Sequence, residues 1–112
     1  MKRTFKWLST YETRARGLKI ISEVERSLEL EIIRNPEKGV LIKGTGGLRK
    51  IRIAGEGKGK STSYRFLYLD LEHIEKTYIF YVFSKKEKVN ISDTEKKILK
   101  ELVVKIKKEA KK

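Results

Sequence analysis

The stretch KGTGGLRKIRIAGEGKGKSTSYR, residues 43–65, holds a short alternating strand with glycine on both sides of it. Because side chains alternate along a strand, Ile51 and Ile53 are expected to point into a core. By the same alternation Lys50 and Arg52 are expected to point together on the other face. Glycine lets the backbone adopt positive φ and approach a ligand closely. A cationic strand between glycine loops suits a phosphate backbone, so RNA is the expected ligand.

Composition supports a polyanionic partner. The 112 residues carry a formal net charge of +13, and the stretch from residue 38 to residue 65 is almost purely basic, with Glu56 as its single acid. An excess of this size indicates nucleic acid or a membrane surface as partner. The sequence has no apolar run near the roughly 20 residues of a membrane span, so we expect a cytoplasmic protein without membrane contact. The length predicts one domain, residues 1–112.

Three serines that precede helix-like segments are followed at the third position by glutamate, the spacing of a helix capping box. They predict a short helix over residues 10–16, a second from residue 22 that ends before Asn35-Pro36, and a C-terminal helix. The pairs are Ser9 with Glu12, Ser22 with Glu25, and Ser92 with Glu95.

Alternating or β-rich segments predict strands at residues 4–8, 48–54, 64–71 and 77–84. The last of these has almost no polar alternation, which indicates a central strand buried on both faces. The expected fold is therefore α+β. An N-terminal helical hairpin packs on a three- to four-stranded antiparallel sheet, followed by a C-terminal helix.

Several chemistries are disfavoured by the residues present. GKGKS resembles a P-loop, but Ala54 stands where that motif requires its first glycine, and a β-rich segment follows where a helix is needed. His73, the only histidine, lies in an acidic turn, and the chain has no cysteine. We therefore expect no nucleotide hydrolysis, no Ser/His/Asp triad, no metal site and no cofactor.

The cationic cluster remains. Arg65 can approach Lys50 and Arg52 if the strands 48–54 and 64–71 are neighbours in a hairpin. Two or three cations that converge on one phosphate could stabilise the charge that develops there during transfer. The plainer interpretation is a solvated surface or a passive RNA-binding patch, and it stays open for each single lysine.

The segments PEKG, KGTGGLRKIRIAGEGKGKS, YRFLY and YVFSKKEK resemble the RelE/HigB toxins of toxin–antitoxin pairs, over roughly residues 4–110. GTGGLRK with the following GKGK loop is similar to the HigB-like branch. The resemblance implies a RelE-like fold and a metal-independent endoribonuclease that cuts mRNA in the decoding site of the ribosome. It also implies a cognate antitoxin, of helix-turn-helix type, as partner.

The resemblance also implies roles for individual residues. The catalytic positions would be Lys50, Arg52, Arg65, Lys85 and Lys86. The RNA-binding positions would be Lys43, Arg49, Lys58, Lys60 and Phe83. The implied reaction is attack of an RNA 2′-OH on its own 3′ phosphate.

This chain departs from the family at the proton carrier. Phe83 stands where many relatives have tyrosine, and a phenylalanine can stack on a base but cannot transfer a proton. Tyr68 and Tyr81 are possible substitutes, although Tyr68 is expected in the core. The alternative function is a non-catalytic basic RNA- or ribosome-binding module of the same fold. A third is a structural or adaptor protein whose charge is incidental.

Overall fold

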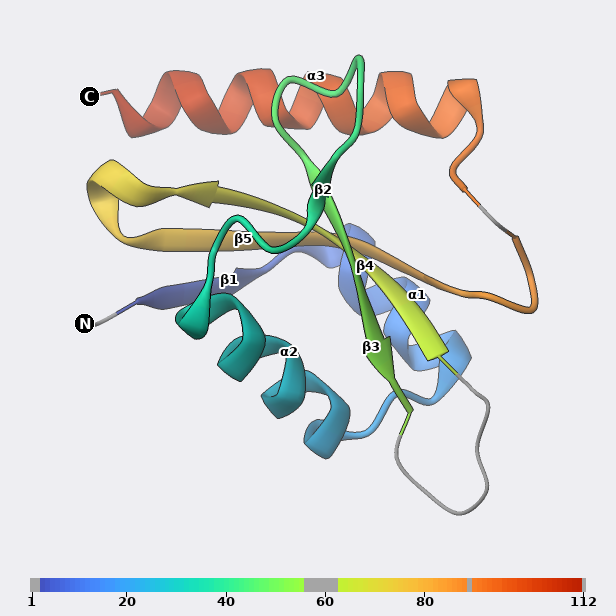
Figure 1. Ribbon diagram of the computed structural model, residues 1–112. Coiled ribbons are helices and arrows are strands. Elements are labelled where there is room, and N and C mark those ends of the chain that lie inside the picture. Colours follow the sequence, from blue (N-terminus) through green and yellow to red (C-terminus); the bar gives the residue numbers. More distant parts are fainter. Residues whose placement is uncertain (1–2, 56–62, 89, 112) are drawn as a thin grey trace.

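The computed structural model describes residues 3–55, 63–88 and 90–111. They form a five-stranded sheet with helices on both faces (Figure 1). In chain order the elements are β1 (Thr4–Trp7), α1 (Ser9–Leu18), α2 (Ser22–Arg34), β2 (Val40–Leu41), β3 (Arg49–Ala54), β4 (Ser63–Leu71), the 3-10 turn η1 (Glu72–Ile74), β5 (Lys76–Ser84) and α3 (Asp93–Ala110).

The strand order is β1-β5-β4-β3-β2. β2 to β5 are antiparallel, as expected, but β1 pairs with β5 in parallel and Thr4 lies opposite Lys76. The predicted α+β class, with the helical pair and the C-terminal helix, is confirmed. The sheet differs from the prediction because β1 joins it in parallel and the two-residue β2 adds an edge.

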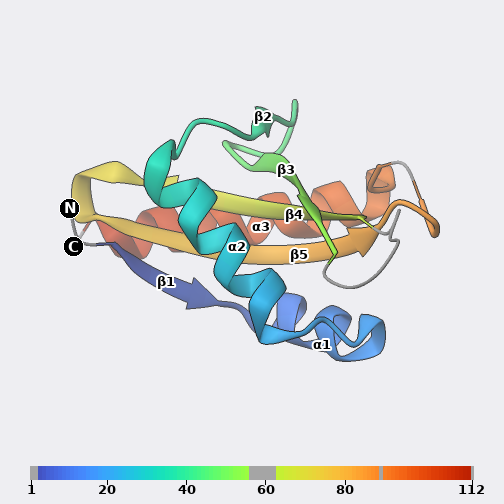
Figure 2. The ribbon, with the colours of Figure 1, turned by 60° about the horizontal axis from the view of Figure 1, so that its bottom comes forward.

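Two apolar layers hold the helices on the sheet. On one face α1 and α2 pack with Tyr11, Val24 and Leu28 against β3 to β5. On the other face α3 packs with Leu99 and Val103. Figure 2 shows the helical pair and α3 on opposite sides of the strands. β5 is covered on both sides, as its apolar sequence predicted.

The three predicted capping boxes have different outcomes. Ser92 accepts a hydrogen bond from the N–H of Glu95, and the Glu95 side chain accepts one from the N–H of Ser92, so this box is confirmed. α1 and α2 begin at Ser9 and Ser22 themselves, and the N-caps are Leu8 and Ile21 without a side-chain cap. The first two boxes were therefore wrong, although the helices themselves are present.

Candidate nucleic-acid interface

An open cleft of about 430 Å³ lies on the sheet face that also carries α3. Its cationic side chains come from two neighbouring strands and from the loop before β2. We call it the basic cleft. Its lining residues are Lys38, Val40, Lys50, Ile51, Arg52 and Arg65.

Strand register explains why the cations meet. Arg52 on β3 lies directly opposite Arg65 on β4, and Lys50 lies opposite Leu67 on the same face. Ile51 and Ile53 point to the other face and join the α1–α2 core. The expected convergence of Lys50, Arg52 and Arg65 is therefore found in the structure.

Ser63 connects Arg65 to the segment after β5. Its side-chain Oγ accepts a hydrogen bond from Nη1 of Arg65 at 3.1 Å. Its carbonyl oxygen accepts one from the N–H of Lys85 at 3.3 Å. Lys85 and Lys86 thus follow β5 beside the start of β4, where both are exposed, but they do not line the basic cleft.

Other predicted RNA-binding residues lie elsewhere. Arg49 is on the opposite face of β3, where its Nη1 donates to the carbonyl oxygens of Glu37 at 3.1 Å and Gly39 at 2.7 Å. Phe83 lies opposite Arg65 but is 0% exposed in the α3 core, so no base can stack on its ring in this structure. Lys58 and Lys60 lie outside the described residues.

The GTGG segment after the exposed Lys43 packs against protein. Gly46 has a φ of +81°, and a Cβ built on it would lie 3.2 Å from Cγ1 of Val103 in α3. Nζ of Lys107, also in α3, donates to the carbonyl oxygen of Gly46 at 2.5 Å. The expectation that these glycines approach a ligand is corrected: the close approach is to α3, and the turn anchors that helix.

Lys38 was not predicted as a site residue. Its ammonium group donates to Oε1 of Glu31 at 2.5 Å, which holds it at the mouth of the basic cleft. The contact joins the end of α2 to the loop that follows Pro36. The sequence offered one signal, a lysine two residues after the proline that follows the helix, but it did not indicate the face on which that lysine would lie.

Tyr81 is tied to the start of α3. Its hydroxyl donates to Oε2 of Glu95 at 2.5 Å, and Nζ of Lys88 donates to the same oxygen at 2.8 Å. Burial and the contact with Glu95 raise the pKa of Tyr81. Burial raises the pKa of Glu95, but hydrogen bonds from Lys88, Tyr81 and the Ser92 N–H outweigh it and lower that pKa to about 2. Tyr81 is therefore a hydrogen-bond donor at neutral pH, engaged outside the basic cleft.

Tyr68, the other tyrosine considered as a proton carrier, is also engaged. Tyr68 is 0% exposed, as expected, and its hydroxyl donates to the carbonyl oxygen of Pro36 at 2.8 Å while it accepts the N–H of Gly39 at 3.0 Å. It fixes the turn after α2. Among the described residues that line the basic cleft, none carries a phenol or an imidazole.

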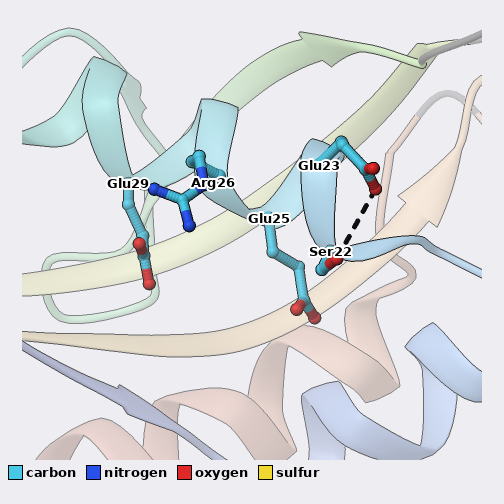
Figure 3. A pocket seen from close by; sticks show the side chains of 5 residues that line it. All are labelled: Ser22, Glu23, Glu25, Arg26 and Glu29. Carbon is cyan, nitrogen blue, oxygen red and sulfur yellow. Dashed lines mark hydrogen bonds between the residues drawn. The ribbon is translucent and has the colours of Figure 1, made fainter.

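A second pocket, of about 360 Å³, lies on α2 and has the opposite character (Figure 3). Its carboxylates repel phosphate, and Arg26 also lines it. Burial raises the pKa of Glu29, and Glu25 accepts a hydrogen bond from Tyr11 at 2.6 Å. The lining residues are Ser22, Glu23, Glu25, Arg26 and Glu29.

In residues 3–55, 63–88 and 90–111, no three His, Asp or Glu side chains gather as a metal-binding group. Within the same ranges no helix combines the length and apolarity that a bilayer crossing requires.

Comparison with protein families gives one match that spans almost the whole chain. The model described as the RelE toxin of the RelE / RelB toxin-antitoxin system matches residues 5–112. The match includes all three helices and nearly the entire sheet.

Proposed function

This chain belongs to the RelE toxin family, and from this premise we propose that it is a ribosome-dependent endoribonuclease that cuts mRNA in the decoding site. Membership makes it a toxin of a toxin–antitoxin system, in a family of endoribonucleases that inhibit translation. The observation that carries the proposal is the convergence of Lys50, Arg52 and Arg65 on one cleft.

In the proposed reaction the 2′-oxygen of one nucleotide attacks its own 3′ phosphate. The 2′-O–P bond forms, the P–5′-O bond breaks, and the products are a 2′,3′-cyclic phosphate and a 5′-OH end. Lys50, Arg52 and Arg65 neutralise the charge that develops on the non-bridging oxygens. Lys85 and Lys86, beside the start of β4, supply further positive charge at the same end of the strand.

The reaction also moves one proton from the 2′-OH to the leaving 5′-oxygen. Because no phenol or imidazole lines the described part of the cleft, we propose that a cationic side chain exchanges this proton. Orientation of the 2′-OH within the ribosome then supplies much of the rate enhancement. The proposed chemistry uses no metal ion. Toxin that has been pretreated with a chelator should therefore still cleave mRNA in vitro on ribosomes that are supplied with Mg²⁺.

The family implies a cognate antitoxin. We propose that this antitoxin is of helix-turn-helix type. We also propose that the toxin acts in the cytoplasm as a single domain and that the toxin belongs to the HigB-like branch. The GTGGLRK and GKGK segments support the last point.

The test is expression in a bacterial host with sequencing of mRNA 5′ ends. Growth arrest with new 5′-OH ends in translated frames is expected for the wild-type protein. Arg65→Ala and Lys50→Ala should each lower cleavage by about 100-fold, the usual effect of removing one group that stabilises transition-state charge. Lys97→Ala, an exposed residue of α3 outside the cleft, is the control and should cleave as wild type.

The second candidate is a non-catalytic module that binds RNA or ribosomes. The absence of a phenol from the described lining of the basic cleft favours it. Folded wild-type protein that cosediments with ribosomes but yields no new 5′ ends would support this candidate and exclude the nuclease.

A further inference from the structure

Ser63 is a buried polar side chain at the start of β4, the strand that carries Arg65. Ser63 is 2% exposed, and its Oγ accepts a hydrogen bond from Nη1 of Arg65 at 3.1 Å. Residues two apart on a strand point to the same face, so Ser63 lies on the face of the basic cleft. Arg65 lines that cleft and Ser63 does not. The Ser63 hydroxyl can therefore influence a ligand in the cleft only through Arg65.

Arg65 needs such a partner because a second arginine lies directly opposite it. Arg52 on β3 is paired with Arg65 in the strand register, and both line the basic cleft. Like charges that lie directly opposite each other on two strands repel. Before RNA binds, this repulsion drives the long Arg65 side chain away from Arg52 and toward solvent. The hydrogen bond to Ser63 opposes that displacement.

The hydrogen bond to Ser63 leaves most of the Arg65 guanidinium available to a ligand. A guanidinium is planar and carries five N–H donors in a fixed fork, of which this contact uses one. Phosphate is recognised well by two parallel N–H donors of such a fork. Because Ser63 is shielded from solvent, water competes little for its Oγ, and the contact is stronger than it would be on an open surface.

Ser63 is itself fixed by main-chain contacts on both sides. It is paired with Ala54 on β3, and its carbonyl oxygen accepts a hydrogen bond at 3.3 Å from the N–H of Lys85, just after β5. A group carried by a paired strand holds its neighbour more precisely than a group on a loop. The hydroxyl of Ser63 is therefore a rigid attachment point for the Arg65 guanidinium.

We propose that Ser63 is a positioning residue, which holds the guanidinium of Arg65 where charge develops on the scissile phosphate. The proposal rests on the proposed nuclease function, because it takes the basic cleft to hold that phosphate. No bond to Ser63 forms or breaks in the reaction. A positive charge that is already in place stabilises the transition state without reorganisation at the moment of reaction. Loss of the hydroxyl should therefore lower kcat and leave KM almost unchanged.

The first test is a double-mutant cycle measured by mRNA cleavage on programmed ribosomes. Ser63→Ala should lower kcat by about tenfold, the effect of losing one hydrogen bond to a charged group. In an Arg65→Ala background the same change should lower kcat by no more than about twofold, because its effect passes through the guanidinium. Ser63→Thr keeps a hydroxyl and should restore most of the lost activity. Ser22→Ala, which removes an exposed serine of α2, is the matched control and should cleave as wild type.

Urea denaturation of each variant separates a loss of kcat from a loss of folded protein. Equal effects of Ser63→Ala in the two backgrounds would show that Ser63 supports the fold in general, and they would overturn the positioning role. An unchanged kcat in Ser63→Ala would overturn it as well, even if Arg65→Ala still abolishes cleavage and the nuclease function stands.

The second test needs neither RNA nor cleavage. Nitrogen NMR spectroscopy measures how fast the Arg65 guanidinium rotates, and the signal is assigned by its loss in Arg65→Ala. Rotation should be several-fold faster in Ser63→Ala than in the wild type, and unchanged in Ser22→Ala. Equal rotation rates in the wild type and Ser63→Ala would contradict the proposed attachment. A wild-type protein that holds Arg65 in this way yet never cleaves mRNA would contradict only the nuclease function.

Discussion

At the scale of single residues, Gly39 is a position where an added methyl group would meet a buried side chain. A Cβ there would lie 2.8 Å from Cε1 and 2.9 Å from the hydroxyl oxygen of the buried Tyr68. Because Tyr68 is held by Pro36 and Gly39, it cannot move without losing these contacts.

We therefore expect Gly39→Ala to lower the free energy of unfolding by about 1–3 kcal/mol, the usual cost of overpacking a core. Urea denaturation measures it. The control is Gly17→Ala, since a Cβ on Gly17 would have no neighbour within 4 Å. Alanine is the better helix former, so the control should be neutral or more stable than the wild type. A Gly39→Ala protein as stable as the wild type would show that the close packing of Gly39 on Tyr68 does not contribute to stability.

Single residues also show how far the sequence predicted the site. Simple alternation along β3 was enough to bring Lys50 and Arg52 together, and pairing with β4 added Arg65. The same alternation places Arg49 with Ile51, so its position on the other face was predictable and was missed. The burial of Phe83 was predictable too, because the segment 77–84 was expected to be buried on both faces, and that expectation conflicted with a base-stacking role for its ring.

At the scale of secondary-structure elements, helix starts and glycine turns were the least predictable. The three serine–glutamate pairs used to predict helices have the same spacing, yet of these only Ser92 caps its helix, since Ser9 and Ser22 are themselves the first helical residues. A glycine-rich loop is free to approach any neighbour, so GTGG did not reveal whether it would face RNA or α3.

The capping difference gives a matched pair of variants. Ser92→Ala removes the hydrogen bond to the N–H of Glu95 and should lower the free energy of unfolding by about 1 kcal/mol. Ser22→Ala removes no cap and should leave that free energy within about 0.5 kcal/mol of the wild type. Chemical denaturation of both proteins compares them, and equal losses would contradict the assignment of the caps.

The hydrogen bonds of Glu95, where α3 begins, predict that the stability of the fold decreases at acidic pH. The folded pKa of Glu95 is about 2, below its value of 4.5 in the unfolded chain. Its contribution to stability is therefore fully present above pH 4.5 and is lost as the pH falls from there toward 2. Glu95→Gln should lower stability at pH 7 and flatten the pH dependence between 4.5 and 2, as followed by denaturation at each pH. An unchanged slope in the variant would place the acid sensitivity elsewhere.

At the scale of the whole molecule, charge is segregated by face. The acidic pocket lies on α2, and the basic cleft lies on the opposite side of the sheet, where Lys50, Arg52 and Arg65 point. The +13 net charge is therefore unevenly distributed between the two faces, and the resulting field would orient the protein as it approaches RNA.

Binding should consequently depend steeply on salt. Each phosphate neutralised on a single strand contributes about −0.7 to the slope of log K against log salt concentration. Arg52→Gln should reduce the magnitude of the slope by about that amount, while Lys97→Gln on α3 should leave it unchanged. Titrations of single-stranded RNA from 50 to 300 mM salt, roughly the range over which phosphate contacts are screened, measure both. Identical slopes would show that RNA binds outside the basic cleft.

The parallel pairing of β1 with β5 also has a consequence for the order of folding. β1 is the first strand to be synthesised, but its hydrogen-bonding partner is the last strand of the sheet. The hairpin of β3 and β4 joins neighbours in the chain and can close early, whereas β1 must remain unpaired until β5 has emerged during synthesis. β1, the first strand of the sheet to be synthesised, is therefore the last strand to find its hydrogen-bonding partner.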